Sequence, residues 1–137
     1  MAFDDKFRLS CHAVILREGA NEAEVLLLKA TYGSLSWGLP GGALEPAETI
    51  HQALIRECRE ELGLTIKINY LTGVYYHSAY DSQAFLFKCE MDEFDKIKLS
   101  DEHSQYLFMP ISLLSAVQRT RVVDCIEFNG AVISRKF

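Results

Sequence analysis

Three glutamates on one predicted helix are the residues with the clearest capacity for chemistry. Residues 50–62 have helical spacing, and at 100° per residue Glu57, Glu60 and Glu61 share one flank, which runs into the edge of the apolar arc. Like charges three and four residues apart oppose a helix, and partial burial adds a desolvation cost. Mg²⁺ is usually held by carboxylates, waters and substrate phosphates. The spacing therefore predicts a divalent metal site on this flank.

Two neighbouring features bear on that prediction. The same projection turns Arg56 toward water, from where it reaches Glu60 and leaves two carboxylates uncompensated. The loop before the helix contains the run WGLPGG, in which the paired glycines Gly41 and Gly42 let the backbone approach a ligand. A solvated acidic helix face is the alternative, because runs of charge commonly face water.

The predicted helix has defined ends. Thr49 and Gln52 form a capping box, in which each side chain accepts a hydrogen bond from a backbone N–H at the start of the helix. Gly63 supplies the stop, since glycine readily adopts the left-handed conformation just past a helix end. These signals place the helix at residues 50–62.

The remaining elements follow from hydrophobic periodicity. Apolar and alternating runs predict strands, the first two joined as a hairpin by a polar loop, at 9–16, 25–28, 66–77, 83–88 and 105–109. Pro110 opens a short predicted helix through Val117, and a terminal helix is expected from Val122 onward. Strands and helices do not alternate regularly, so we expect the α+β class, as a mixed α/β sandwich.

Composition narrows the classes of function. The chain has 137 residues, the size of one domain, so residues 1–137 are treated as a single unit. The net charge of −5 argues against a broad basic surface for duplex nucleic acid. No apolar run is long enough for a membrane span and the first residues lack a signal-peptide pattern, so we expect a soluble, cytoplasmic protein. The four cysteines lack metal-ligand spacing, which favours reduced, buried thiols over a disulfide or a reactive thiol.

The segment around the three glutamates resembles the Nudix box, the signature of the Nudix hydrolase family. The box reads G-x5-E-x7-R-E-U-x-E-E-x-G-U, where U is aliphatic, and residues 42–64 match every fixed position. The matching residues are Gly42, Glu48, Arg56, Glu57, Glu60, Glu61 and Gly63. Cys58 at the first U position is the one departure, and it is small and apolar enough to pack.

The resemblance implies a mixed sheet sandwiched between helices and a hydrolase, dependent on Mg²⁺ or Mn²⁺, of a nucleoside diphosphate linked to another group. It makes Glu57 and Glu61 the principal metal ligands, with the Gly41 carbonyl completing the shell. Glu60 joins them as a ligand or acts as the base. Such a site suits the reaction, because cations screen a negative pyrophosphate and lower the pKa of the attacking water.

Further roles follow from the same resemblance. Arg56 and Glu48 would pair and hold the loop to the helix. In several family members the base is a Glu outside the box, and here Glu102 is the matching candidate, with Asp101 and His103 beside it. A loop acid that faces water is the alternative for Glu102. The general base is therefore left open among Glu57, Glu60 and Glu102.

Four residues outside the box are candidates for substrate binding, each with an ordinary structural alternative. Lys29 contacts phosphate or is an exposed strand-end lysine, and Trp37 stacks on a base or supports its loop. Tyr80 lies where a Tyr accompanies dinucleoside polyphosphate substrates in some Nudix subgroups. Asn129 reads a base edge, as in some nucleotide-cleaning members, or serves as a helix cap or a turn residue. His12, inside an apolar strand, is interpreted as a core histidine.

The resemblance favours a pyrophosphohydrolase of a small nucleotide, such as a nucleoside or deoxynucleoside triphosphate, including oxidised forms. A dinucleoside polyphosphate or a nucleotide sugar is the alternative substrate. An alternative from another class is a nucleotide-binding module that has the fold without the activity, and a plain acidic helical domain without metal is the third. Many family members dimerise, so a homodimer is one of the states that the resemblance allows.

Overall fold

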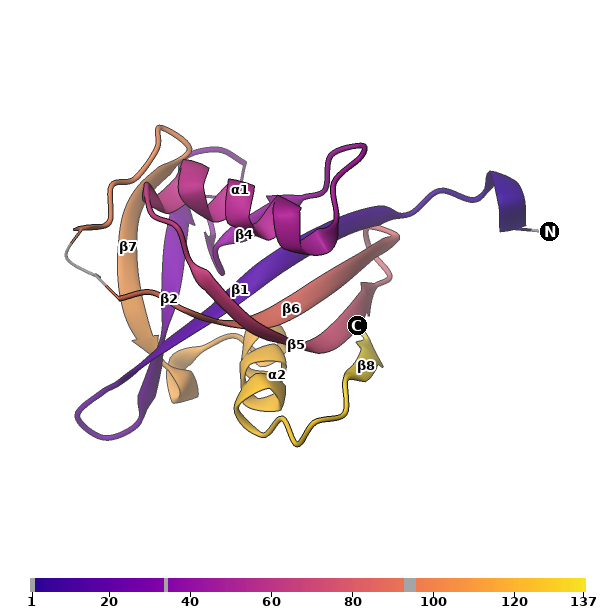
Figure 1. Ribbon diagram of the computed structural model, residues 1–137. Helices are drawn as coiled ribbons and strands as arrows, with labels where there is room; N and C mark the ends of the chain where they lie inside the picture. Colours follow the sequence, from indigo (N-terminus) through magenta and orange to yellow (C-terminus); the bar gives the residue numbers. More distant parts are fainter. Residues whose placement is uncertain (1, 34, 93–95) are drawn as a thin grey trace.

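The computed structural model describes residues 2–33, 35–92 and 96–137, and a twisted mixed sheet lies at its centre between two helices (Figure 1). The strands are β1 (Arg8–Glu18), β2 (Ala23–Ala30), β3 (Trp37–Gly38), β4 (Gly41–Ala43), β5 (Lys67–His77), β6 (Ser82–Glu90), β7 (His103–Pro110) and β8 (Ile133–Lys136). The helical elements are α1 (Ile50–Leu62) and α2 (Ala116–Ile126), with the 3-10 turns η1 (Ala2–Asp4) and η3 (Ile111–Leu113). The main path of the sheet is β3-β2-β1-β6-β5-β8, with β4 paired to β1 and β7 paired to β2. This architecture confirms the α+β class.

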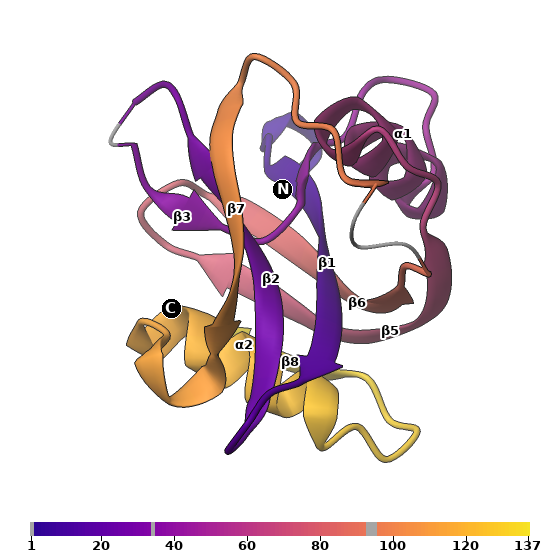
Figure 2. The same cartoon turned by 90° about the vertical axis from the view of Figure 1, so that its left-hand side faces the viewer.

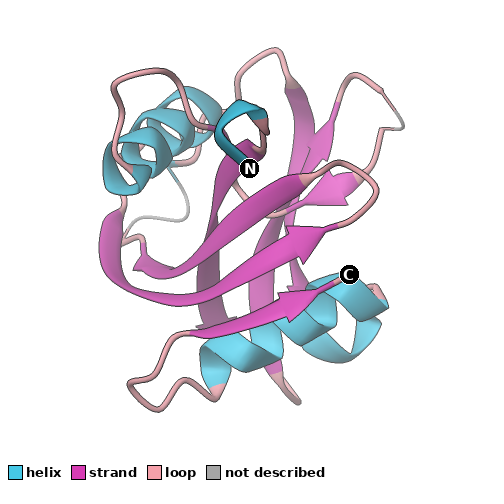
Figure 3. Ribbon diagram, turned by 90° about the vertical axis from the view of Figure 1, so that its right-hand side faces the viewer, coloured by secondary structure: helices cyan, strands magenta, loops and turns pink. Residues whose placement is uncertain are grey.

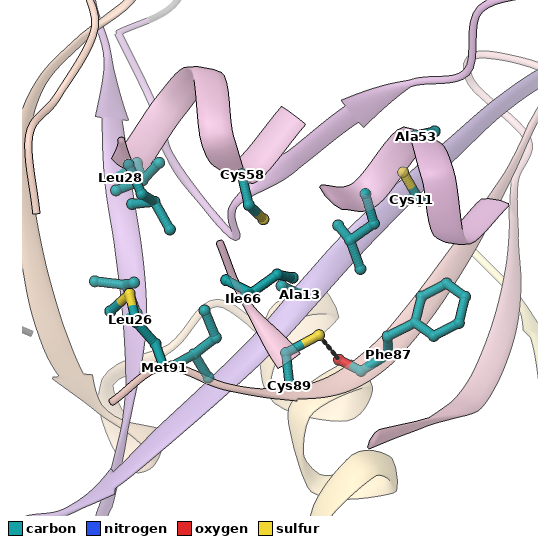
Figure 4. Packing of buried hydrophobic residues seen from close by; sticks show 13 residues of the cluster. Cys11, Ala13, Leu26, Leu28, Ala53, Cys58, Ile66, Phe87, Cys89 and Met91 are labelled. Atoms are coloured by element: carbon teal, nitrogen blue, oxygen red, sulfur yellow. Dashed lines mark hydrogen bonds between the residues drawn. The ribbon is translucent and has the colours of Figure 1, made fainter. Parts of the chain in front are cut away.

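The interior forms two apolar clusters because side chains on β1 alternate between the two faces of the sheet. Cys11, Ala13 and Ile15 pack in the cluster beneath α1, whereas Val14 packs in the cluster against α2. Figure 3 shows the two helices on opposite sides of the strands. In the α1 cluster, Cys58 points from the helix toward the strands (Figure 4). All four cysteines are buried and unpaired, as predicted.

Helix α1 has the predicted bounds. The Thr49 side chain accepts a hydrogen bond from the Gln52 N–H, and the Gln52 side chain accepts one from the Thr49 N–H, which confirms the capping box. Gly63 ends the helix in the left-handed region at φ 70°, with its N–H donating to the Arg59 carbonyl. A Cβ at Gly63 would lie 3.2 Å from Lys98, so both the backbone conformation and the space favour glycine.

The prediction for residues 110–137 was wrong in the bounds of the helices and in the type of the last element. In place of two helices, residues 110–117 contribute η3 and the start of one helix, α2, and the chain ends in the strand β8. The Ser115 side chain accepts a hydrogen bond from the Gln118 N–H and caps α2. Gly130, at φ 102°, turns the chain after the helix, and β8 then pairs in parallel with β5. The partner strand, distant in sequence, overrides the local helical pattern.

The loop before α1 also contains strands that periodicity did not predict. Strand β4 is three residues long and pairs with β1, with Gly41 opposite His12 and Gly42 opposite Cys11. A Cβ at Gly41 would lie 2.0 Å from the Cys11 carbonyl oxygen. Only glycine allows this close approach of β4 to β1. The pairing of the two strands places Gly41 and Gly42 beside α1. Within the described residues, no helix is long and apolar enough to span a membrane.

Candidate active site

Glycines of β4 and glutamates of α1 meet at the edge of the sheet. The Gly41 N–H donates to Glu61 Oε1 at 2.7 Å. A Cβ on Gly42 would lie 2.6 Å from the Glu57 carboxyl carbon, so the absence of a side chain at Gly42 leaves the space that this carboxylate occupies. The structure therefore brings together four of the residues named from the sequence, two glycines and two carboxylates.

Arg56 binds the loop to the helix and is largely covered. Its guanidinium pairs with both carboxylate oxygens of Glu48, at 2.7 and 2.9 Å, and also donates to Glu57 at 3.0 Å and to Glu60 at 3.4 Å. A further hydrogen bond reaches the Ala43 carbonyl. The projection that turned Arg56 toward water was wrong, since 24% of its side chain is exposed. Its long side chain folds back along the helix to the loop, and pairing with Glu48 raises the pKa of Arg56.

The two inner carboxylates are poorly compensated. Burial raises the pKa of Glu61 to about 8, with added repulsion from Glu57, Glu102 and Glu60, although the Gly41 N–H opposes the shift. Burial also raises the pKa of Glu57, and the hydrogen bond from Arg56 offsets part of that rise. A nearby cation favours the charged form of such carboxylates and lowers their pKa values.

The loop before β7 closes the site from the other side. Thr31, at the end of β2, donates to the carbonyls of Asp101 and Glu102, which anchors this loop. Glu102 is exposed, and its charge contributes to the raised pKa values of Glu57 and Glu61. The proximity of Glu102 to the glutamates of α1 thus comes from the pairing of β7 with β2 (Figure 2).

His103 faces Glu61 directly. Its Nε2 lies 3.4 Å from Glu61 Oε2, and both side chains are less than a tenth exposed. Burial lowers the pKa of His103, whereas the nearby Glu102 opposes that shift. The other ring nitrogen of His103 is buried and has no hydrogen-bond partner among the described residues. His103 therefore lines the site with a polar side chain, and it follows Glu102, one of the candidate bases, in the sequence.

A cavity of about 240 Å³ opens beside Glu61. Its walls include His12, Leu39, Gly41, Gly42, Glu61 and His103. His12, interpreted from the sequence as a core residue, instead lines this cavity, and its ring lies 2.9 Å from the Ser10 hydroxyl. Its position opposite Gly41 in the β1–β4 ladder explains this placement, and the short strand β4 gave no periodic signal from which to predict it.

None of the four residues named for substrate binding lines that cavity. Lys29 and Trp37 face each other across the β2–β3 ladder, and both are half-buried. Asn129 is exposed in the loop after α2, where its side-chain oxygen accepts a hydrogen bond from the Ala131 N–H. Tyr80, in the β5–β6 turn, lines a different hollow of about 660 Å³ together with Phe7 and Glu48.

The donor atoms at the site fit a hard divalent cation. Within the described residues, no three His, Cys, Asp or Glu side chains are already arranged as a metal-ligand set. The carboxylates of Glu57 and Glu61 nevertheless supply oxygen donors and carry raised pKa values, and the exposed Glu60 adds a third carboxylate on the same flank. Mg²⁺ and Mn²⁺ prefer ligands of this chemistry.

The chain is similar to several curated proteins over about half of its length. An ADP-ribose pyrophosphatase of Methanocaldococcus jannaschii is 38% identical over 74 residues, 51% of this chain and 44% of that protein. A putative 8-oxo-dGTP diphosphatase of Bacillus subtilis is 33% identical over 67 residues, 49% of this chain and 45% of that protein. The chain spans less than half the length of the first curated relatives that it matches.

Among solved structures, a Caenorhabditis elegans Ap4A hydrolase in a binary complex has the same fold, with a TM-score of 0.73 and 24% identity over 88% of this chain and 96% of that one. The family model described as NUDIX domain matches residues 6–124. The matched range contains β4, α1 and the loop before β7, which together build the carboxylate site. The chain therefore belongs to the Nudix family.

Proposed function

We propose that this protein is a divalent-metal-dependent pyrophosphohydrolase that cleaves a phosphoanhydride bond in a nucleoside diphosphate linked to another group. A nucleoside or deoxynucleoside triphosphate, including oxidised forms, is the proposed substrate. The observation that carries the proposal is the pairing of the half-buried Glu57 and the buried Glu61, set against Gly42 and Gly41 with pKa values raised by burial. The names of the relatives support the same class of reaction.

The proposed cofactor is Mg²⁺ or Mn²⁺. Glu57, Glu61 and Glu60 would hold it, with the Gly41 carbonyl as a further ligand. When bound, the cation supplies charge that screens the phosphates and lowers the pKa of the attacking water. The side chains of the protein perform the remaining steps of the reaction.

These side chains position the substrate and take up a proton. Arg56 pairs with Glu48 and also donates a hydrogen bond to Glu57. These contacts hold the Glu57 carboxylate at the proposed metal site. The base that accepts the proton from water must lie within hydrogen-bond reach of that water. Glu102, Glu60 and Glu57 are the candidates, and the substitutions E102Q and E60Q separate them, because loss of the base lowers kcat while substrate binding is retained.

A dinucleoside polyphosphate is the second candidate substrate. The segment from Gly41 to Glu48 is flanked by two hollows, one lined by His12 and Glu61 and the other by Phe7 and Tyr80. A substrate with two nucleosides would place one nucleoside in each hollow. The similarity to a bis(5'-nucleosyl)-tetraphosphatase of Caenorhabditis elegans, 31% identical over 99 residues, favours the same alternative.

The proposal treats residues 1–137 as one domain that acts on a small molecule in the cytoplasm, alone or as a homodimer, without binding duplex nucleic acid. Its net charge of −5 and its four buried, unpaired thiols support this setting. Size-exclusion chromatography with light scattering measures the oligomeric state.

A hydrolysis screen, in which the phosphorylated products are separated by ion-exchange chromatography, tests the function. The substrates are normal and oxidised nucleoside triphosphates, dinucleoside polyphosphates and nucleotide sugars, each with Mg²⁺, with Mn²⁺ and with EDTA. We expect metal-dependent turnover, fastest with a nucleoside triphosphate. Nucleotide binding without turnover of any substrate would contradict the proposal and favour a silent binding module.

A further inference from the structure

A bulge in the sheet turns His103 toward the candidate active site. Strand β7 pairs regularly with β2 as far as Lys29 and Gln105, but the next pair joins Ala30 to His103, so the register shifts by one residue. In a regular ladder Ser104 would lie opposite Ala30, and His103 would point to the other face of the sheet. Ser104 is instead exposed, whereas only 9% of the His103 side chain is exposed. The bulge therefore gives His103 a buried position that regular pairing would give to Ser104.

This position faces the cavity of about 240 Å³. Leu28 and Ala30, which alternate onto one face of β2, line the cavity together with His103. The backbone just before His103 is also held, because Thr31 donates its N–H to the Glu102 carbonyl at 2.9 Å and its hydroxyl to the preceding carbonyl at 2.8 Å. The ring of His103 thus has a defined place at the cavity.

The Glu61 carboxylate meets a different strand at each of its oxygens. Oε1 accepts the N–H of Gly41, in β4, at 2.7 Å, and Oε2 lies 3.4 Å from Nε2 of His103, at the start of β7. The side chains of Glu61 and His103 are both less than a tenth exposed. A distance of 3.4 Å is long for a hydrogen bond, and such contacts commonly tighten once a site is loaded. The fold thus places one nitrogen at each oxygen of the carboxylate.

The second ring nitrogen of His103 shows that packing alone does not explain this residue. Nδ1 is buried and has no hydrogen-bond partner within the part of the chain that the structure describes. A buried polar atom without a partner is unfavourable, and an aromatic ring without nitrogen would fill the same space without that cost. The nitrogen that faces Glu61 is the feature that such an apolar ring would lack.

We propose that His103 is a positioning residue for Glu61, whose Nε2–H donates to Oε2 and fixes the carboxylate in the orientation that receives the divalent cation. Hydrogen-bonded partners of this kind orient the carboxylates of metal sites, and their loss typically lowers metal affinity by about ten- to a hundredfold. His103 acts through Glu61 and is not itself a metal ligand. The inference rests on the proposed function, because it assumes that Glu61 holds the cation.

Binding of Mn²⁺ to the full chain without substrate, followed by electron paramagnetic resonance, tests this role apart from catalysis. In H103F the ring remains and the donor is lost, so the dissociation constant should rise by about tenfold or more. In H103Q the side-chain amide nitrogen reaches the place of Nε2, so the affinity should remain close to that of the unaltered chain. A role in packing alone predicts the reverse order, because phenylalanine fills the space of the ring better than glutamine does. The matched control is H51Q, which removes an exposed histidine of α1 and should leave the affinity unchanged.

A measurement on the unaltered chain does not depend on how the variants fold. With saturating Mg²⁺, NMR of the ring nitrogens should show that Nε2 of His103 carries a proton. An Nε2 without a proton would overturn the inference. So would equal Mn²⁺ affinity in H103F and the unaltered chain, or an affinity that is lost in H103Q and kept in H103F.

The same measurements separate this inference from the proposed function. Weaker Mn²⁺ binding in H103F, together with no hydrolysis of any nucleotide by the unaltered chain, would contradict the proposed function alone. Metal-dependent hydrolysis by the unaltered chain, together with undiminished Mn²⁺ affinity in H103F, would contradict this inference alone. An unaltered chain that binds no Mn²⁺ would contradict both.

Discussion

At the residue scale, the site depends on two positions without a side chain, Gly41 and Gly42, as well as on its carboxylates. Gly42 has no side chain where the Glu57 carboxylate lies, and Gly41 approaches β1 too closely for any Cβ. The two glycines therefore act by leaving space and by offering backbone groups. Glu61 shows the complementary role, since it accepts the Gly41 N–H on one oxygen and faces His103 with the other.

The substitution Gly42→Ala tests this use of space. Its Cβ would overlap the Glu57 carboxyl group, so the carboxylate must move, and displacement of a catalytic group by about 1 Å costs on the order of a hundredfold in rate. We expect kcat/KM to fall by about that factor, with the far-UV circular dichroism spectrum unchanged. Gly130→Ala is the control, because nothing lies within 4 Å of its Cβ position and it lies in the loop after α2, outside the cavity beside Glu61. Equal activity of both variants would contradict the assignment.

The sequence identified residues at this scale unevenly. The fixed residues of the box could be named because their spacing lies within one helix and the loop beside it. His12 could not, because its neighbours depend on which strands meet. It borders the cavity through the pairing of β1 with β4, a strand of only three residues.

At the element scale, the local sequence explains the bounds of α1 better than those of α2. The ends of α1 follow from Thr49, Gln52 and Gly63, whose hydrogen bonds are all made within a few residues, and its bounds were predicted correctly. The region after residue 110 depends on contacts between distant segments. The salt bridge of Asp124 with Arg135 and the hydrogen bond from Tyr75 join α2, β8 and β5. Such contacts leave no periodic signal in the sequence.

The pairing of Asp124 predicts a pH dependence of stability. Arg135, followed by the Tyr75 hydroxyl, lowers the pKa of Asp124 below its ordinary value. A depressed pKa contributes stability that is fully present above the unfolded value of about 3.9 and is lost as pH falls through the lower folded value. Asp124→Asn should therefore lower Tm at pH 7, and the difference from the unaltered chain should shrink below about pH 4.

Thermal unfolding at several pH values measures this effect. Glu127→Gln, an exposed change at the end of the same helix, is the control and should leave Tm nearly unchanged at every pH. A difference between Asp124→Asn and the unaltered chain that stays constant down to pH 2 would contradict the assigned role of the carboxylate.

At the scale of the whole molecule, the negative charge is concentrated at one place. Of the 19 acids, four surround Arg56 on the loop and helix, and two more lie close by: Glu45, Glu48, Glu57, Glu60, Glu61 and Glu102. A polyphosphate approaching this end meets repulsion unless cations are present, because bound divalent ions reverse the local sign of the charge. The metal is thus expected to be needed for binding as well as for the reaction.

Affinity measurements with and without metal test this expectation. A non-hydrolysable nucleoside triphosphate analogue should bind at least about tenfold more weakly in EDTA than with Mg²⁺, since even one unit charge close to a phosphate changes the binding energy by more than 1 kcal/mol. The matching nucleoside carries no charge and should bind equally well in both conditions. Equal affinity of the analogue in both conditions would contradict the electrostatic account.

The central claim is that Glu57 and Glu61 form the catalytic metal site, and the substitution Glu57→Gln tests it most directly. Glutamine keeps the size of the side chain and removes its charge. With the best nucleotide from the screen and with Mg²⁺, the account predicts a loss of turnover of at least about a hundredfold in a folded protein. Glu90→Gln, an exposed acid at the end of β6, should keep full activity. Unchanged turnover in Glu57→Gln would contradict the account.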